Sequence, residues 1–207
     1  ALFVSLVENY DKKCYKKALK LADQILLRFP ENGKTISMKG LTLGLGMKNM
    51  EEGFALAKTG LRHDMKNHVC WHVYGLLYRS DRNYAQAMKC YQQALKINET
   101  NLGILSDLAL LQVQQRNFDK YCESRRKLLV NTTKQSKTNW VGFAVAHYLA
   151  GHHDVAIGVI DQYLGTFSKT REPDYQDSEL TMLKVLIYQE KGDLDQSLKC
   201  LLDNDKM

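Results

Sequence analysis

Residues 69–94 read VCWHVYGLLYRSDRNYAQAMKCYQQA, and this stretch decides the fold. A small residue stands inside each half, Gly75 in the first and Ala87 in the second. Two helices approach closely only where side chains are small, and aromatic side chains fill the volume around such a crossing. The filling positions follow at helical spacing: Trp71, Tyr74 and Tyr78, then Tyr91 and Ala94. The stretch therefore predicts two antiparallel helices packed as a hairpin.

The pattern returns along the chain at a period near 34 residues, which is the length of a tetratricopeptide repeat. The small position of the second helix falls at Ala18, Gly53, Ala87, Tyr121, Ala156 and Ser197, and first-helix anchors fall at Gly40, Gly75, Ala109 and Trp140 with Ala144. Stacked hairpins bury a core that one hairpin cannot bury alone. We predict an all-α, right-handed α-solenoid of about six tetratricopeptide-type hairpins, approximately 2–30, 34–64, 67–98, 101–131, 137–168 and 176–204.

The whole chain, residues 1–207, is predicted to be a single superhelix without an internal domain boundary. Only two prolines occur, which suits long helices, and Gly and Asn in the short turns are expected to supply left-handed or capping conformations. The first residue is not Met, so we expect a fragment of a longer chain. Five scattered cysteines predict reduced thiols, and no apolar run is long enough to span a membrane.

Charge is unevenly distributed along the sequence. Residues 1–150 carry 23 Lys and Arg against 12 Asp and Glu, a net charge of +11, whereas residues 151–207 carry 6 against 11, a net charge of −5. Two basic clusters are candidates for contact with ribosomal RNA. The first is Lys13, Lys16, Lys17 and Lys20, and the second is Arg125, Arg126 and Lys127, followed by Lys134 and Lys137 in an expected polar loop. The first four are expected to share one helical face, although lysine stripes are also common on simply solvated helices.

Residues 60–84 resemble the auxiliary subunit of the NatA N-terminal acetyltransferase, as do residues 38–43 and 89–96. The likeness covers nearly the whole chain and is strongest over about 36–112. The resemblance implies a superhelical scaffold that wraps a small catalytic subunit and docks the complex on the ribosome in the cytoplasm. It also implies that this chain has no catalysis of its own. Acetyl-CoA would bind the catalytic partner, whose contacts would come mostly from repeats that are absent here.

No pattern of catalytic, cofactor or metal-binding residues is found in the sequence. An acetyl-CoA loop would need Gln or Arg where Leu41 precedes Gly44 and Gly46, and a helix end explains these glycines better. His68, Cys70 and His72 are two residues apart, so on a helix they point to different faces. No Cys-x2-Cys or His-x3-His pair indicates zinc, so ordinary packed or exposed histidines are expected.

The first helices of the repeats should line a groove. Its candidate contact residues are His72, Leu76, Arg79 and Gln114. The mid-helix groove positions are predicted to form an apolar ladder: Leu41, Leu76, Leu110 and Val145. Such a ladder argues against clamping a peptide carboxylate and fits either a docked helix or simple packing. A generic peptide-binding adaptor or co-chaperone is the alternative to the acetyltransferase scaffold.

Overall fold

The structure is a computed structural model that describes residues 2–132, 136–167 and 174–204. The described residues form helices and turns and include no strand. Lys134 and the polar connection 168–173 lie outside them. The chain divides into two compact units, residues 1–111 and 112–207, and each is described by itself.

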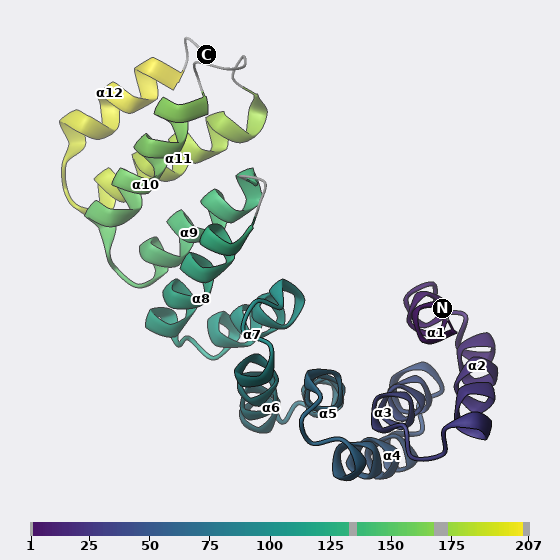
Figure 1. Ribbon diagram of the computed structural model, residues 1–207. Coiled ribbons are helices and arrows are strands. Elements are labelled where there is room, and N and C mark those ends of the chain that lie inside the picture. The colour runs from purple at the N-terminus through teal and green to yellow at the C-terminus, as the bar shows by residue number, and fades with distance from the viewer. Residues whose placement is uncertain (1, 133–135, 168–173, 205–207) are drawn as a thin grey trace. The chain divides into compact units, whose positions relative to one another are not determined.

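The helices pair in sequence order (Figure 1). The first seven are α1 (Leu2–Asp11), α2 (Tyr15–Arg28), α3 (Gly33–Leu41), α4 (Met50–His63), α5 (His68–Ser80), α6 (Tyr84–Ile97) and α7 (Leu102–Gln114), and a π-helical turn (Thr42–Gly46) follows α3. The others are α8 (Phe118–Asn131), α9 (Lys137–Leu149), α10 (His153–Phe167), α11 (Tyr175–Glu190) and α12 (Leu194–Asn204). Two consecutive helices pack against each other in each of the pairs α1/α2, α3/α4, α5/α6, α9/α10 and α11/α12. The predicted all-α fold of helical hairpins is thus confirmed, whereas the single superhelix over 1–207 stays a prediction.

The crossing of α5 and α6 is built as the sequence pattern indicates. A Cβ atom on Gly75 would lie 2.5 Å from the ring of Tyr91, so only glycine fits there. Tyr91, Ala87 and Ala94 are each fully buried, with Ile104, Leu108 and Leu111 of α7 packed in the same cluster. Tyr74 and Tyr78 pack on Phe54 of α4, with ring centroids 5.9 and 5.1 Å away. Trp71 is half-buried, and its indole N–H donates to the Met65 carbonyl at 2.9 Å.

The other two cores use the same repeat positions. In residues 1–111, one cluster of buried side chains consists of Leu6, Ala22, Met38, Leu41, Ala57 and Leu77. Gly40 packs against α4 beside it. In residues 112–207, Ala144, Ala156, Ile160, Tyr163 and Leu180 form another, with Trp140 packed on it. Each unit therefore buries apolar side chains between neighbouring helices, as stacked hairpins require.

The turn inside each hairpin contains one residue in the left-handed backbone region. These residues are Lys13, Lys48, Arg82, Arg116, Gly151 and Gly192, with φ between 56° and 79°. They repeat with the period of the small positions. Glycine supplies this conformation at Gly151 and Gly192, as expected, whereas Lys or Arg adopts it at the other four positions. Asparagine caps the next helix, also as expected: the side chains of Asn49 and Asn83 accept hydrogen bonds from the Glu52 and Gln86 amides.

No helix in the described ranges combines the length and apolarity that crossing a membrane would need.

Candidate functional site

Three polar side chains join the first helices of two neighbouring hairpins. Asp107 of α7 accepts a hydrogen bond from Arg79 Nη1 of α5 at 2.7 Å, and its second oxygen lies 2.8 Å from Nε2 of His72. The side chain of Asp107 is 23% exposed, and the ring of His72 packs 5.5 Å from that of Tyr91. The predicted groove residues His72 and Arg79 are thus brought together, but around Asp107, which the sequence analysis did not single out.

The neighbours of Asp107 stabilise its charged form. Burial raises the pKa of this carboxyl, but the hydrogen bond from His72 and the charge of Arg79 outweigh burial and hold the pKa below its usual range. The arrangement has no nucleophile and leaves both carboxylate oxygens occupied. It fixes α5 against α7, and Asp107 already engages both His72 and Arg79, so neither side chain is left to clamp an incoming carboxylate.

Replacing Asp107 with asparagine should destabilise the chain at neutral pH by about 1–3 kcal/mol, because the network loses its negative charge and one of its two acceptor oxygens. A lowered pKa in the folded state means that the carboxylate stabilises the fold above the unfolded pKa of about 3.9 and stops doing so as pH falls through the lower folded value. The difference in the free energy of unfolding between wild type and Asp107→Asn should therefore become smaller below about pH 4. Urea unfolding at pH 7 and at pH 3 measures this difference, and a difference that does not change with pH would contradict this account.

The apolar ladder is only partly present. Leu41 is 2% exposed and belongs to the core cluster around Leu77, so its prediction as a groove position is wrong. It lies where α3 passes into the π-helical turn, and the extra residue of such a turn rotates the helix face. Leu76 is half-buried between two core clusters, whereas Leu110 is 53% exposed and Gln114 is exposed.

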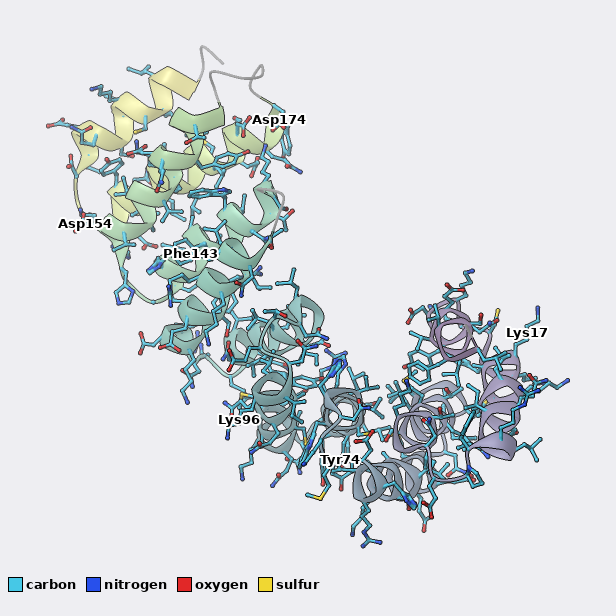
Figure 2. The ribbon with its side chains drawn as sticks, in the orientation of Figure 1. Lys17, Tyr74, Lys96, Phe143, Asp154 and Asp174 are labelled. Atoms are coloured by element: carbon cyan, nitrogen blue, oxygen red, sulfur yellow. The ribbon has the colours of Figure 1, made fainter. Side chains whose placement is uncertain are left out.

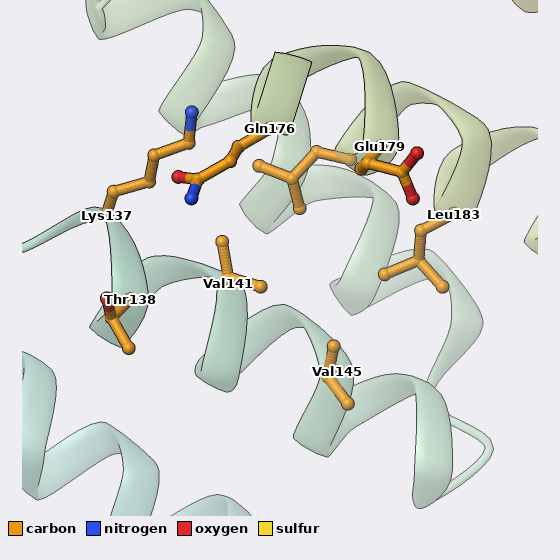
Figure 3. A pocket seen from close by; sticks show the side chains of 8 residues that line it. Lys137, Thr138, Val141, Val145, Gln176, Glu179 and Leu183 are labelled. Carbon is orange, nitrogen blue, oxygen red and sulfur yellow. The ribbon is translucent and has the colours of Figure 1, made fainter. Parts of the chain in front are cut away.

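The fourth ladder residue, Val145, lines a cavity of 410 Å³ between α9 and α11 (Figure 3). One wall is Lys137, Thr138, Val141 and Val145, and the other is Gln176, Glu179, Leu180 and Leu183. Lys137 pairs with Asp174 and, at 2.8 Å, with Asp177, which is 4% exposed. Burial lowers the pKa of Lys137, but the hydrogen bonds that its ammonium donates to these two carboxylates outweigh burial and raise the pKa. The exposed lining of the cavity is mostly apolar, so it suits an apolar side chain of a partner.

The two basic clusters differ in surroundings. Lys16, Lys17 and Lys20 are exposed on α2, and among the described residues no ion pair engages them; Figure 2 shows Lys17 pointing away from the helix. Lys13 lies in the turn before α2, so the expectation that it shares their helical face is wrong. Arg126 and Lys127 are exposed.

Arg125, by contrast, is built into the fold. Its Nε donates to the Tyr121 hydroxyl at 2.9 Å, and its guanidinium lies over that ring. The guanidinium also lies against Gly142 of α9, where an added Cβ would come within 2.7 Å of it. Tyr121 replaces the small residue expected at this position, and Arg125 packing on it explains how the larger side chain is accommodated.

A cluster that the sequence analysis missed lies at one end of α9. The side chains of Cys122, His147 and His152 place one potential ligand atom each within 4.8 Å of the others. The residues are 25 and 5 positions apart, and no short motif has these spacings. Only the packing of α8 on α9 and the shape of the following turn bring them together.

The repeated helical hairpins define a tetratricopeptide-repeat protein of the α-solenoid class. Residues 4–154 match the family described as Psidin, N-terminal TPR repeats region, and the chain belongs to that family. YrrB, a TPR protein with an unusual peptide-binding site, shares only 14% identity but has a TM-score of 0.69 over 88% of this chain and 90% of its own, which shows the fold alone.

Within the tetratricopeptide-repeat proteins, this chain is similar to auxiliary subunits of N-terminal acetyltransferases. The N-terminal acetyltransferase A complex auxiliary subunit NAA15 of Arabidopsis thaliana is 44% identical over 96% of this chain and 22% of its own length. The human NatA auxiliary subunit N-alpha-acetyltransferase 16 is 42% identical over 96% of this chain and 23% of its own. The structure of Naa15/Naa10 bound to HypK-THB has a TM-score of 0.78 and 40% identity, covering 97% of this chain and 30% of that one. The resemblance noted from the sequence is confirmed, and the chain spans under a quarter of these curated relatives.

Proposed function

We propose that this chain is the N-terminal scaffold part of a NatA auxiliary subunit, supporting the acetyltransferase complex without chemistry of its own. The observation that carries the proposal is similarity to such subunits at 42–44% identity over 96% of the chain. The Naa15/Naa10 structure supports a catalytic subunit as the partner of the complete protein. We propose further that acetyl-CoA binds that partner and not this chain. The test is acetyl transfer to peptides beginning with Ser or Ala: the purified chain alone should give none, and any turnover would refute a scaffold role.

The finer part of the proposal is docking on the ribosome in the cytoplasm. Lys16, Lys17 and Lys20 supply three exposed cations within two turns of α2. Arg126 and Lys127 add a second exposed pair on α8. Such cations bind phosphates with an affinity that falls steeply with salt, because binding releases counterions. The alternative, a peptide-binding adaptor, is disfavoured because Asp107 already occupies His72 and Arg79.

Replacing Lys16, Lys17 and Lys20 with glutamate should reduce co-sedimentation with ribosomes by at least about tenfold near physiological salt, since three phosphate contacts become repulsive. The matched control is Lys58, Lys89 and Lys96, also replaced with glutamate. These lysines are exposed on α4 and α6, so the net charge changes equally. If both triple variants lost ribosome binding equally, the net charge of the chain, and not the position of the three lysines on α2, would explain the loss. Unchanged binding in the α2 variant would refute the docking surface.

A further inference from the structure

Cys122, His147 and His152 come from three successive elements of residues 112–207. Cys122 lies on α8 and is 7% exposed, His147 lies near the end of α9 and is half-buried, and His152 lies in the exposed turn before α10. The Nδ1 atoms of the two histidines are 3.4 Å apart, and Sγ of Cys122 lies within 4.8 Å of the ring nitrogens. The cluster therefore has a buried sulfur at its base and is open to solvent at the histidine side.

The backbone holds the two histidines together. Gly151, with a φ of +76°, ends α9 in the left-handed region. Its N–H donates to the Tyr148 carbonyl at 2.9 Å, and the N–H of His152 donates to the His147 carbonyl, also at 2.9 Å. This pair of bonds is the Schellman arrangement, which reverses the chain at a helix end. The ring of Phe143 packs edge-on against that of His147 at 4.6 Å, so the ring of His147 is supported from the preceding turn of α9.

The separations are close to those of a tetrahedral metal site. With metal–nitrogen bonds of about 2.1 Å and metal–sulfur bonds of about 2.3 Å, tetrahedral ligand atoms stand roughly 3.4–3.6 Å apart. The two Nδ1 atoms already have this spacing. One ligand atom of each residue lies within 4.8 Å of the others, so no separation has to close by more than roughly 1.4 Å for that geometry. His152 has the freedom to move because its side chain is exposed.

We propose that Cys122, His147 and His152 bind one zinc-class transition metal ion, with a solvent molecule in the fourth position. One thiolate and two imidazoles favour zinc, cobalt and similar ions over magnesium and calcium, which prefer oxygen ligands. On binding, the S–H bond of Cys122 breaks, a metal–sulfur bond forms and the proton leaves to solvent. The bound ion ties α8 to the turn between α9 and α10, which links two neighbouring hairpins of this unit.

The thiol is protonated in the absence of a metal. Burial and then the charge of Asp119, one helical turn earlier, raise the pKa of Cys122. The ion has to displace this proton, and the nearby carboxylate favours the approach of a cation. The alternative to a metal site is a hydrogen bond between the two histidines beside an unreactive buried thiol. Titration with metal ions distinguishes this alternative from a metal site.

The experiment is a titration of the whole chain with Co²⁺ alone, then with Zn²⁺, with the thiols kept reduced by a phosphine and any affinity tag removed. We expect one Co²⁺ per chain, a thiolate-to-cobalt charge-transfer band in the near ultraviolet and the visible bands of tetrahedral cobalt. Zn²⁺ should abolish these bands and raise the thermal unfolding midpoint. A titration without the charge-transfer band, or with octahedral cobalt bands only, would overturn the proposal.

His152→Gln is the variant that best tests whether the cluster binds a metal ion. Because His152 lies in an exposed turn, this substitution leaves the fold intact. It should weaken Co²⁺ binding by at least about a hundredfold, since losing a ligand costs more than losing a partner of a ligand. The matched control is His153→Gln: His153 stacks on Tyr148 and lies 3.7 Å from Glu190. Cys122→Ser should remove the charge-transfer band, whereas Cys200→Ser should keep it. Equal affinity in His152→Gln and His153→Gln would overturn the site even if Cys122→Ser fails to fold.

Discussion

Replacing Tyr91 with alanine should lower the free energy of unfolding by about 3–5 kcal/mol, as expected for removing a buried aromatic ring. Tyr91 is fully buried in the cluster formed by α6 and α7, and its ring fills the space that Gly75 leaves open. Because a Cβ on Gly75 would lie only 2.5 Å from the ring, the two backbones are already close and cannot collapse much further into the cavity. Urea denaturation followed by circular dichroism measures the loss.

Tyr91→Phe is the matched control for this prediction. The Tyr91 hydroxyl is buried and has no hydrogen-bond partner among the residues that the structure describes. Desolvation by burial accordingly raises its pKa. Removing an unsatisfied buried hydroxyl should leave stability within about 1 kcal/mol of wild type or increase it. A loss in Tyr91→Phe as large as in Tyr91→Ala would mean that the hydroxyl, and not the ring, stabilises the crossing.

The hairpins were predictable because their signal is local. Small residues at a period near 34 and aromatic residues at helical spacing report directly which faces touch, as Gly75 and Tyr91 show. The structure adds that the left-handed turn residue recurs with the same period, although Lys13, Lys48, Arg82 and Arg116 carry a side chain there. Turn geometry imposed by the two helices overrides the ordinary preference for glycine, at a cost of roughly 1–2 kcal/mol per turn.

The site residues were less predictable because they depend on contacts between hairpins. The sequence gives no sign that Asp107 reaches His72, 35 residues earlier, since that contact depends on how α7 packs on α5. The cluster of Cys122, His147 and His152 depends likewise on the packing of α8 on α9. Leu41 failed as a groove residue because of the π-helical turn, which no pattern in residues 36–46 had indicated.

Gly53→Ala should destabilise the chain by about 2–3 kcal/mol, even though alanine is the better helix former. The reason is the contact between α3 and α4 and the π-helical turn. A Cβ on Gly53 would lie 2.7 Å from Cα of Gly44, 2.9 Å from the carbonyl oxygen of Gly40 and 3.0 Å from N of Gly44. All three atoms belong to the backbone, so no side-chain rotation relieves the clash and the two helices must move apart. Moving them opens the core around Leu41 and Ala57, which packs across the same pair.

Gly158→Ala is the control with the same chemical change inside a helix. A Cβ on Gly158 of α10 would meet nothing within 4 Å, so only the helix preference changes and stability should rise by up to about 1 kcal/mol. Thermal unfolding of the two variants should therefore shift in opposite directions from wild type. If both variants gained stability, α3 and α4 would have room for a methyl group at Gly53, and glycine would not be what sets the distance between these helices. Loss in Gly53→Ala with gain in Gly158→Ala would show that the space between the backbones, rather than helix propensity, selects glycine at this crossing.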